Sequence, residues 1–297
     1  MKRTLSCIVC LVLTAAALCG CAPAAPADIA ATTMPVYTFT QALCSGTPLT
    51  VSRLITQDVA CLHDYTLNVD QVKTAESAQT IVISGAGLEE SFLSGLLMED
   101  KLIDASEGIS LLCPEEEDHE DHEGHDHHGH THDSDPHIWL DPENAMVMAE
   151  NICRGLSLRY PQYQDVFEEN LRQLLGELDA LLIYGRETLS SLTCREMITF
   201  HDGFAYFAGA FDLTILEAVE EESGSEASAR ELIHLISLTR SHELPAVFTE
   251  INSSASAADV IARETGAAVF QLDMAMSGSS YFDAMYHNIS TVKEALG

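Results

Sequence analysis

QYQDVFEENLRQLLGELDALLIYGRETLSSL, residues 162–192, contains no proline and carries apolar side chains every three or four residues. This spacing predicts an amphipathic helix that starts just after Pro161. Roughly thirty helical residues span about 45 Å, which is too long for an ordinary α/β crossover. The alternative is two shorter helices, broken at Gly176 or Gly185. The periodic side chains are Phe167, Leu171, Leu174, Leu175, Leu178, Leu181, Leu182 and Leu189.

On both sides of this helix, short β-rich runs alternate with helical patterns, which is typical of α/β folds with mostly parallel sheets. We predict two similar lobes, 33–162 and 193–297, joined by a long helix at 163–192. The predicted strands are 49–55, 80–84, 108–112, 196–200, 213–219, 245–250 and 267–273. The predicted helices are 36–45, 68–77, 88–97, 142–158, 227–241, 254–265 and 282–296.

The N-terminal stretch MKRTLSCIVCLVLTAAALCGC, residues 1–21, has two basic residues before a short apolar run, as export signals do. Leu18 and Gly20 before Cys21 resemble the lipobox of bacterial lipoproteins. We therefore predict cleavage before a lipidated Cys21, and a flexible Ala/Pro-rich tether at 22–32. The alternatives are a plain signal peptide or a membrane span, although the run is short for a span. The folded part is predicted outside the cytoplasm, on the outer face of the cell membrane or in a periplasm.

The formal net charge of −32 limits the partners of this chain. Binding to nucleic acid requires clustered Lys and Arg, so a nucleic-acid partner is excluded. Cations are the natural partners of such a field. No stretch after the N-terminal run is apolar enough to span a membrane.

Five cysteines follow Cys21, and an odd number fixes no pairing. Cys44 and Cys61 flank one predicted strand, and a disulfide between them is the pairing we expect. Buried free thiols are the alternative. The remaining three are Cys113, Cys153 and Cys194.

The most conspicuous run is EEEDHEDHEGHDHHGHTHDSD, residues 115–135, with seven histidines and ten carboxylates. It has no apolar periodicity, so we predict a disordered insertion. Neutral imidazoles bind divalent cations, and a segment without fixed geometry binds several metals weakly. An acidic spacer is the alternative. The seven histidines are His119, His122, His125, His127, His128, His130 and His132.

Outside this run, four residues of types that can bind metals lie near the predicted carboxyl ends of strands or in loops, where α/β sheets bind ligands. They are His63, His137, His201 and Asp273. They are separated by 64 to 74 residues, so spacing alone does not show that they converge.

A family resemblance supplies this step. Six segments resemble, in the same order, motifs of the zinc- and manganese-binding lipoproteins of cation ABC transporters (cluster A-I, ZnuA/TroA-like). The match extends from about residue 30 to the C-terminus. DPHIWLDP and HDGFAYF are its most specific parts. The six segments are LHDYTLNVDQV (62–72), GAGLEESF (85–92), DPHIWLDPENA (135–145), FHDGFAYFA (200–208), SEASARELIHLI (225–236) and ETGAAVFQLD (264–273).

The resemblance implies that His63, His137 and His201 ligate one metal between the lobes, with Asp273 as a fourth ligand. Glu250 is a second, weaker candidate. Three imidazoles suit Zn²⁺, whereas Mn²⁺ favours more oxygen ligands. Manganese-type members tend to carry a carboxylate at the position of His201. Zinc is therefore the expected metal and manganese the alternative.

The resemblance also implies a function: a lipid-anchored, monomeric receptor that captures Zn²⁺ and passes it to an ABC permease and its ATPase subunit, without chemistry on the metal. In such a site, Asp64 and Asp202 are interpreted as turn or supporting groups beside the ligands. One rival is a zinc hydrolase, because three ligands and an open position suit catalysis. Another is a metal buffer or adhesin that acts through 115–135 alone.

Overall fold

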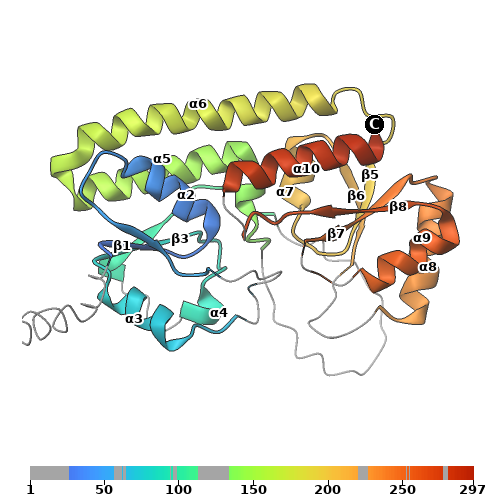
Figure 1. Ribbon diagram of the computed structural model, residues 1–297, viewed down its shortest axis with the longest axis horizontal. Coiled ribbons are helices and arrows are strands. Elements are labelled where there is room, and N and C mark those ends of the chain that lie inside the picture. Colours follow the sequence, from blue (N-terminus) through green and yellow to red (C-terminus); the bar gives the residue numbers. More distant parts are fainter. Residues whose placement is uncertain are drawn as a thin grey trace, which may run out of the picture.

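The computed structural model describes residues 27–56, 62, 65–93, 95, 99–112, 134–219, 227–251, 253, 255–276 and 280–297. They form two lobes, each built on a four-stranded sheet whose paired strands are all parallel. Helix α6 (Gln164–Leu189) runs along both lobes (Figure 1). The predicted α/β class with two parallel-sheet lobes is confirmed.

The N-terminal lobe has the strand order β2-β1-β3-β4. Strand β1 is fully buried and lies within 22–32, so the tether predicted there is wrong at its C-terminal end. Helix α3 begins with a capping box in which Asn68 and Gln71 satisfy each other's backbone N–H groups. The elements are β1 (Ile29–Ala31), α2 (Met34–Leu43), β2 (Val51–Arg53), α3 (Val69–Ser77), β3 (Thr80–Ile83), α4 (Glu90–Leu93), a 3₁₀ turn (Glu99–Lys101) and β4 (Leu102–Asp104).

One predicted strand of this lobe is wrong. The segment 108–112 is not a strand, and the edge of the sheet is formed by β4 instead. Ile103 of β4 is buried, whereas Leu111 and Leu112 are exposed. A short apolar run can belong to an exposed loop as well as to a strand, and periodicity does not separate the two.

The C-terminal lobe repeats the arrangement with the order β6-β5-β7-β8. Its strands and its helices α8, α9 and α10 match the predicted ranges to within two residues, and α7 was not predicted. In each sheet the order reverses between the first strand and the third, which is where open α/β sheets bind ligands. The elements are β5 (Glu196–Thr199), α7 (Ala205–Ala210), β6 (Thr214–Ala218), α8 (Ala229–Ser241), β7 (Ala246–Glu250), α9 (Ser256–Thr265), β8 (Ala268–Leu272) and α10 (Tyr281–Leu296).

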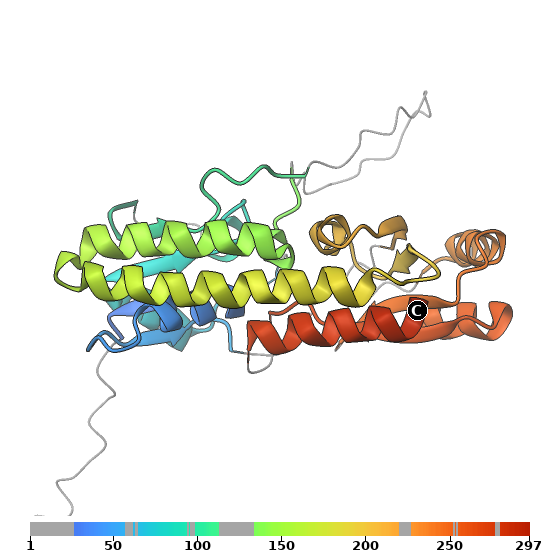
Figure 2. The ribbon, with the colours of Figure 1, turned by 90° about the horizontal axis from the view of Figure 1, so that it is seen from above.

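The long helix is continuous, as predicted. Helix α5 (Pro142–Arg159) precedes it and, after a 3₁₀ turn at Pro161–Tyr163, the chain returns along α6, antiparallel to α5 (Figure 2). Gly185 does not break α6. A Cβ there would lie 2.2 Å from Cε1 of Phe211, so this glycine lets the C-terminal lobe pack directly on the helix.

One large hydrophobic cluster extends across both lobes, and each lobe also has a smaller cluster of its own. Tyr281 at the start of α10 packs edge-on against Phe39 of α2, with ring centroids 5.0 Å apart. Its hydroxyl donates to the carbonyl of Trp139 at 2.8 Å. The Trp139 indole N–H in turn donates to the carbonyl of Met274 at 2.8 Å. The lobes are therefore joined by buried contacts as well as by α6.

The cysteines do not support the expected disulfide. Cys44 is a buried free thiol at the end of α2, and burial raises its pKa to about 12. Its predicted partner, Cys61, lies outside the described residues, as do Cys21 and Cys113. Cys153 and Cys194 are also free. Within the described ranges no helix combines the length and the apolarity that a membrane span requires.

Candidate metal centre

The structure describes three of the four predicted ligands: His137, His201 and Asp273. His63 lies outside the described residues, and so do all seven histidines of the 115–135 run. The end of that run is described. Ser134 and Asp135 lead directly into a 3₁₀ turn at Ile138–Leu140, so the predicted disordered insertion is wrong in its last two residues.

His137 is nearly inaccessible, with 2% of its side chain exposed. Oδ1 of Asp135 accepts from the backbone N–H of His137 at 2.9 Å and lies 2.8 Å from its Nδ1. Because a carboxylate oxygen only accepts, this contact favours the tautomer of His137 that has its proton on Nδ1. The ring also packs edge-on against Trp139 at 5.4 Å between centroids.

His201 stands two residues after β5, in the loop that leads to α7. Its ring lies edge-on to that of His137, with centroids 5.3 Å apart. The structure thus brings together two predicted ligands that are 64 residues apart in sequence. Nδ1 of His201 lies 3.3 Å from Oε1 of Glu250 at ion-pair distance, but without hydrogen-bond geometry.

Glu250 ends β7 and is 3% exposed. Burial, and then the charge of Asp273, raise the pKa of its carboxyl to about 8. Because β5 and β7 are the strands between which the order reverses, His201 and Glu250 lie at the switch point of this sheet.

Asp273 directly follows β8. Two hydrogen bonds at 2.7 Å tie its backbone to the side chain of Asn288, and its Oδ1 accepts from Ala275 N–H at 2.8 Å. These contacts fix its position at the carboxyl edge of the sheet. The charge of Asp273 contributes to the raised pKa of the Glu250 carboxyl.

Gly203 lies close to both rings, and its lack of a side chain allows them to approach. A Cβ on it would lie 2.6 Å from Cε of Met274, 2.8 Å from Cδ2 of His201 and 3.0 Å from Nδ1 of His137. Any side chain here would therefore displace both imidazoles.

Within the described residues, no three or more His, Cys, Asp or Glu side chains are grouped so that they could hold a metal ion. The described part of the centre is two imidazoles in contact, with one carboxylate near the Nδ1 of each ring. Asp135 and Gly203 were not predicted as site residues, although each lies within two residues of a predicted histidine. Asp202 is exposed, and Asp64 lies outside the described residues.

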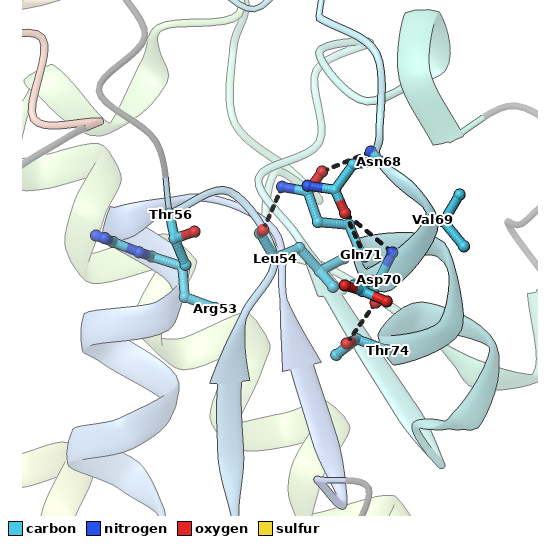
Figure 3. Close-up of a pocket in the computed structure, with 8 residues that line it drawn as sticks. All are labelled: Arg53, Leu54, Thr56, Asn68, Val69, Asp70, Gln71 and Thr74. Atoms are coloured by element: carbon cyan, nitrogen blue, oxygen red, sulfur yellow. Dashed lines mark hydrogen bonds between the residues drawn. The ribbon is translucent and has the colours of Figure 1, made fainter. Parts of the chain in front are cut away.

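A separate hollow lies in the N-terminal lobe, beside the start of α3 (Figure 3). Its volume is about 540 Å³. Asn68 already accepts from the N–H groups of Asp70 and Gln71, so the first turn of the helix is capped from within. None of the described candidate ligands lines it. Its lining residues are Arg53, Leu54, Thr56, Asn68, Val69, Asp70, Gln71 and Thr74.

Residues 29–295 match the family model described as ZnuA, zinc-uptake complex component A, periplasmic. The chain is 28% identical over 280 residues to the zinc-binding lipoprotein AdcA of Streptococcus pneumoniae, covering 90% of this chain and 55% of AdcA. It is 22% identical over 252 residues to the manganese ABC transporter substrate-binding lipoprotein PsaA of Streptococcus mitis. This match covers 79% of this chain and 78% of PsaA.

The fold is also similar to a crystal structure of ZnuA, with a TM-score of 0.75 and 27% identity over 91% of this chain and 99% of that one. The chain spans just over half the length of AdcA. The family model, by contrast, covers nearly all of the described residues. The chain therefore belongs to the ZnuA family.

Proposed function

We propose that this protein is an extracytoplasmic receptor that binds a divalent metal ion and delivers it to an ABC permease and its ATPase subunit. The observation that carries the proposal is the edge-on contact between His137 and His201 beside Gly203, where a Cβ would crowd both rings. Family membership supports it, because the related AdcA and PsaA are named for binding zinc and manganese.

The proposed ligands are His63, His137 and His201, with Asp273 as the fourth. The donors that the structure describes fit zinc, since two neutral imidazoles with a nearby carboxylate are ligands that Zn²⁺ prefers. Glu250, whose Oε1 lies 3.3 Å from Nδ1 of His201, is the second and weaker candidate for a carboxylate ligand. Zinc is the proposed cargo, and manganese, which favours oxygen ligands, is the alternative.

The remaining features complete the proposal. Lipid on Cys21 would hold a monomeric receptor at the outer face of the membrane, close to the permease. The seven histidines of 115–135 would act as an accessory, low-selectivity collector of metal. The receptor does no chemistry on its cargo.

Competition titration of the mature protein with zinc and manganese tests the proposal. We expect one tight zinc site, with manganese binding more weakly, and loss of that site in His201→Ala. The matched control is His242→Ala. His242 also contacts a carboxylate, Glu196, at 2.9 Å, but it lies at the opposite end of β5.

A second variant separates the receptor from a metal buffer. Deletion of 115–133 removes all seven clustered histidines and leaves Asp135 in place. The tight site survives in a receptor and disappears in a buffer or adhesin that works through this run. Zinc-dependent turnover of ester or phosphate substrates by the wild-type protein would instead support a hydrolase.

A further inference from the structure

Asp135 directs its carboxylate at His137. One oxygen, Oδ1, serves both the backbone N–H and Nδ1 of that residue. The other oxygen, Oδ2, is buried and has no hydrogen-bond partner among the described residues. The side chain is 15% exposed, so water screens its charge poorly. Asp135 thus presents a buried acceptor to Nδ1 of His137.

The backbone of Asp135 is itself held in place. Its N–H donates to the carbonyl of Leu112 at 2.8 Å. Its carbonyl accepts from the hydroxyl of Tyr206 at 3.1 Å, and the same hydroxyl accepts from Leu112 N–H at 2.9 Å. Tyr206 belongs to α7 of the C-terminal lobe and is 5% exposed. One phenol therefore joins the two chain segments that flank 113–133.

These contacts form a chain from the C-terminal lobe to the site: Tyr206 to Asp135 to His137. The helix that carries Tyr206 starts two residues after Gly203, in the loop that also carries His201. The loop that supplies one imidazole thus leads directly into the helix that fixes the partner of the other. Movement of α7 would therefore shift the groups that position both His137 and His201.

We infer that Asp135 and Tyr206 are positioning residues for metal capture, which hold His137 with its Nδ1 protonated and its Nε2 lone pair directed at the site. The inference rests on the proposed function in that His137 binds the metal. Carboxylates that accept from the second nitrogen of a ligand histidine commonly fix its tautomer and raise its basicity. In this chain the carboxylate is fixed in turn by a tyrosine of the other lobe.

A purely structural role is the competing explanation. Asp135 accepts from the N–H two residues ahead, as Asp does in an Asx turn, and such a turn needs no contact with Nδ1. Asp135→Asn tests the charge, since an amide oxygen can keep the turn and the Nδ1 contact without it. Asp135→Ala removes both contacts. The tautomer of His137 then distinguishes the two explanations, because a purely structural role predicts no change in it.

The test combines two measurements on the full-length mature protein. Nitrogen-15 NMR of the histidine rings, without metal, reports the tautomer of His137. We expect Nδ1–H in wild type and Asp135→Asn, and a mixture of tautomers in Asp135→Ala. Zinc affinity should fall by about 10- to 100-fold in Asp135→Ala, and by less in Asp135→Asn. In Tyr206→Phe the zinc affinity should fall roughly 5-fold, as expected for the loss of one hydrogen-bonding group.

Tyr160→Phe is the matched control, because its buried hydroxyl contacts Thr80 at 2.9 Å and takes no part in the site. It should leave tautomer and affinity unchanged. Thermal unfolding shows whether each variant folds. An unchanged His137 tautomer in folded Asp135→Ala overturns the inference, and so does a Tyr206→Phe affinity equal to that of wild type. If the wild-type protein binds no metal, the proposed function fails, while the metal-free tautomer measurement still decides the role of Asp135.

Discussion

At the scale of single residues, the centre depends on a missing side chain as much as on those present. Gly203 is buried, and its φ lies outside the left-handed region, so backbone strain is not the reason for a glycine. The reason is space, because His137, His201 and Met274 all lie within 3.0 Å of where a Cβ would stand.

Gly203→Ala therefore tests the geometry of the site with one added carbon. The imidazoles must separate to admit it, and we expect zinc affinity to fall by at least roughly 10-fold, the scale at which supporting groups affect metal sites. Isothermal titration with zinc measures the change. The control is Gly209→Ala in α7, where a Cβ would meet nothing within 4 Å. Equal zinc affinity in the two variants would show that the rings need not be so close.

The residue scale also shows what sequence could and could not provide. His137 and His201 were assigned through family motifs, and the structure shows that they meet. Spacing could not show this, because 64 residues, including all of α6, separate them. Asp135 was assigned to a disordered run on composition, because it follows a long acidic run. Composition does not reveal that it contacts the backbone N–H and Nδ1 of His137. The expected Cys44 disulfide rested on proximity in sequence, which says nothing of where a thiol points.

At the scale of elements, the two sheets use their switch points differently. In the C-terminal lobe this position bears His201 and Glu250. In the N-terminal lobe the carboxylate of Glu89 occupies it, accepting from the Thr32 hydroxyl at 2.6 Å and from the N–H groups of Ser84 at 2.7 Å and Gly85 at 3.0 Å. Thr32 follows β1 and Ser84 follows β3, so Glu89 joins the ends of both strands.

Glu89 makes stability depend on pH. It is 1% exposed, and burial, which outweighs its three hydrogen bonds, raises its pKa from 4.5 to about 7. A raised folded pKa contributes stability below the unfolded pKa and loses it as pH rises through the folded pKa. This contribution, at most about 3 kcal/mol, should therefore disappear between about pH 4.5 and pH 7.

Glu89→Gln isolates this effect. Its amide NH₂ would face a backbone N–H, which costs roughly 1–3 kcal/mol. Urea unfolding of the metal-free proteins at pH 5 should give a larger free energy of unfolding for wild type than for Glu89→Gln. At pH 8 the difference between the two free energies should be smaller. Glu90→Gln, an exposed neighbour, should follow wild type. A difference that grows with pH would mean that Glu89 stabilises the fold as an ionised carboxylate.

Elements with strong local signals were predicted correctly. The amphipathic pattern of α6 and the capping boxes of α3 and α8 depend only on residues close together in sequence. The short elements β4 and α7 carry no such pattern, because their conformation depends on packing with residues distant in sequence. The apolar run 108–112 was wrongly predicted as a strand, because a short apolar run does not show whether it will be buried.

At the scale of the whole molecule, Trp139 connects the lobes beside the site. It is fully buried, packs on His137, donates to Met274 and accepts from Tyr281. Trp139→Phe would leave the Met274 carbonyl without its donor and open a cavity, at a cost of about 2–4 kcal/mol. Urea unfolding measures this cost, and zinc titration should show weaker binding in the same variant. Tyr184→Phe, on the exposed face of α6, serves as the control.

The same interlobe contacts determine how the receptor can respond to its cargo. A hinge motion would have to bend the 26-residue helix α6 or break the packing of Tyr281 on Phe39 and its hydrogen bond to Trp139. These groups are buried, so opening would expose apolar surface and leave polar groups unpaired. Metal binding should therefore move loops at the carboxyl edges of the sheets and leave the lobes in place.

Small-angle scattering of the 115–133 deletion variant, with and without zinc, tests this expectation without a contribution from the His-rich run. The radius of gyration should change by less than about 1 Å, as for partners whose backbones barely move on binding. The metal-free form of Trp139→Phe provides a comparison, because a weakened interlobe contact should make any hinge easier to detect. A decrease of several ångströms in the radius of gyration on zinc binding would show that the interlobe contacts open. It would also show that α6 bends as a hinge and does not hold the lobes rigidly.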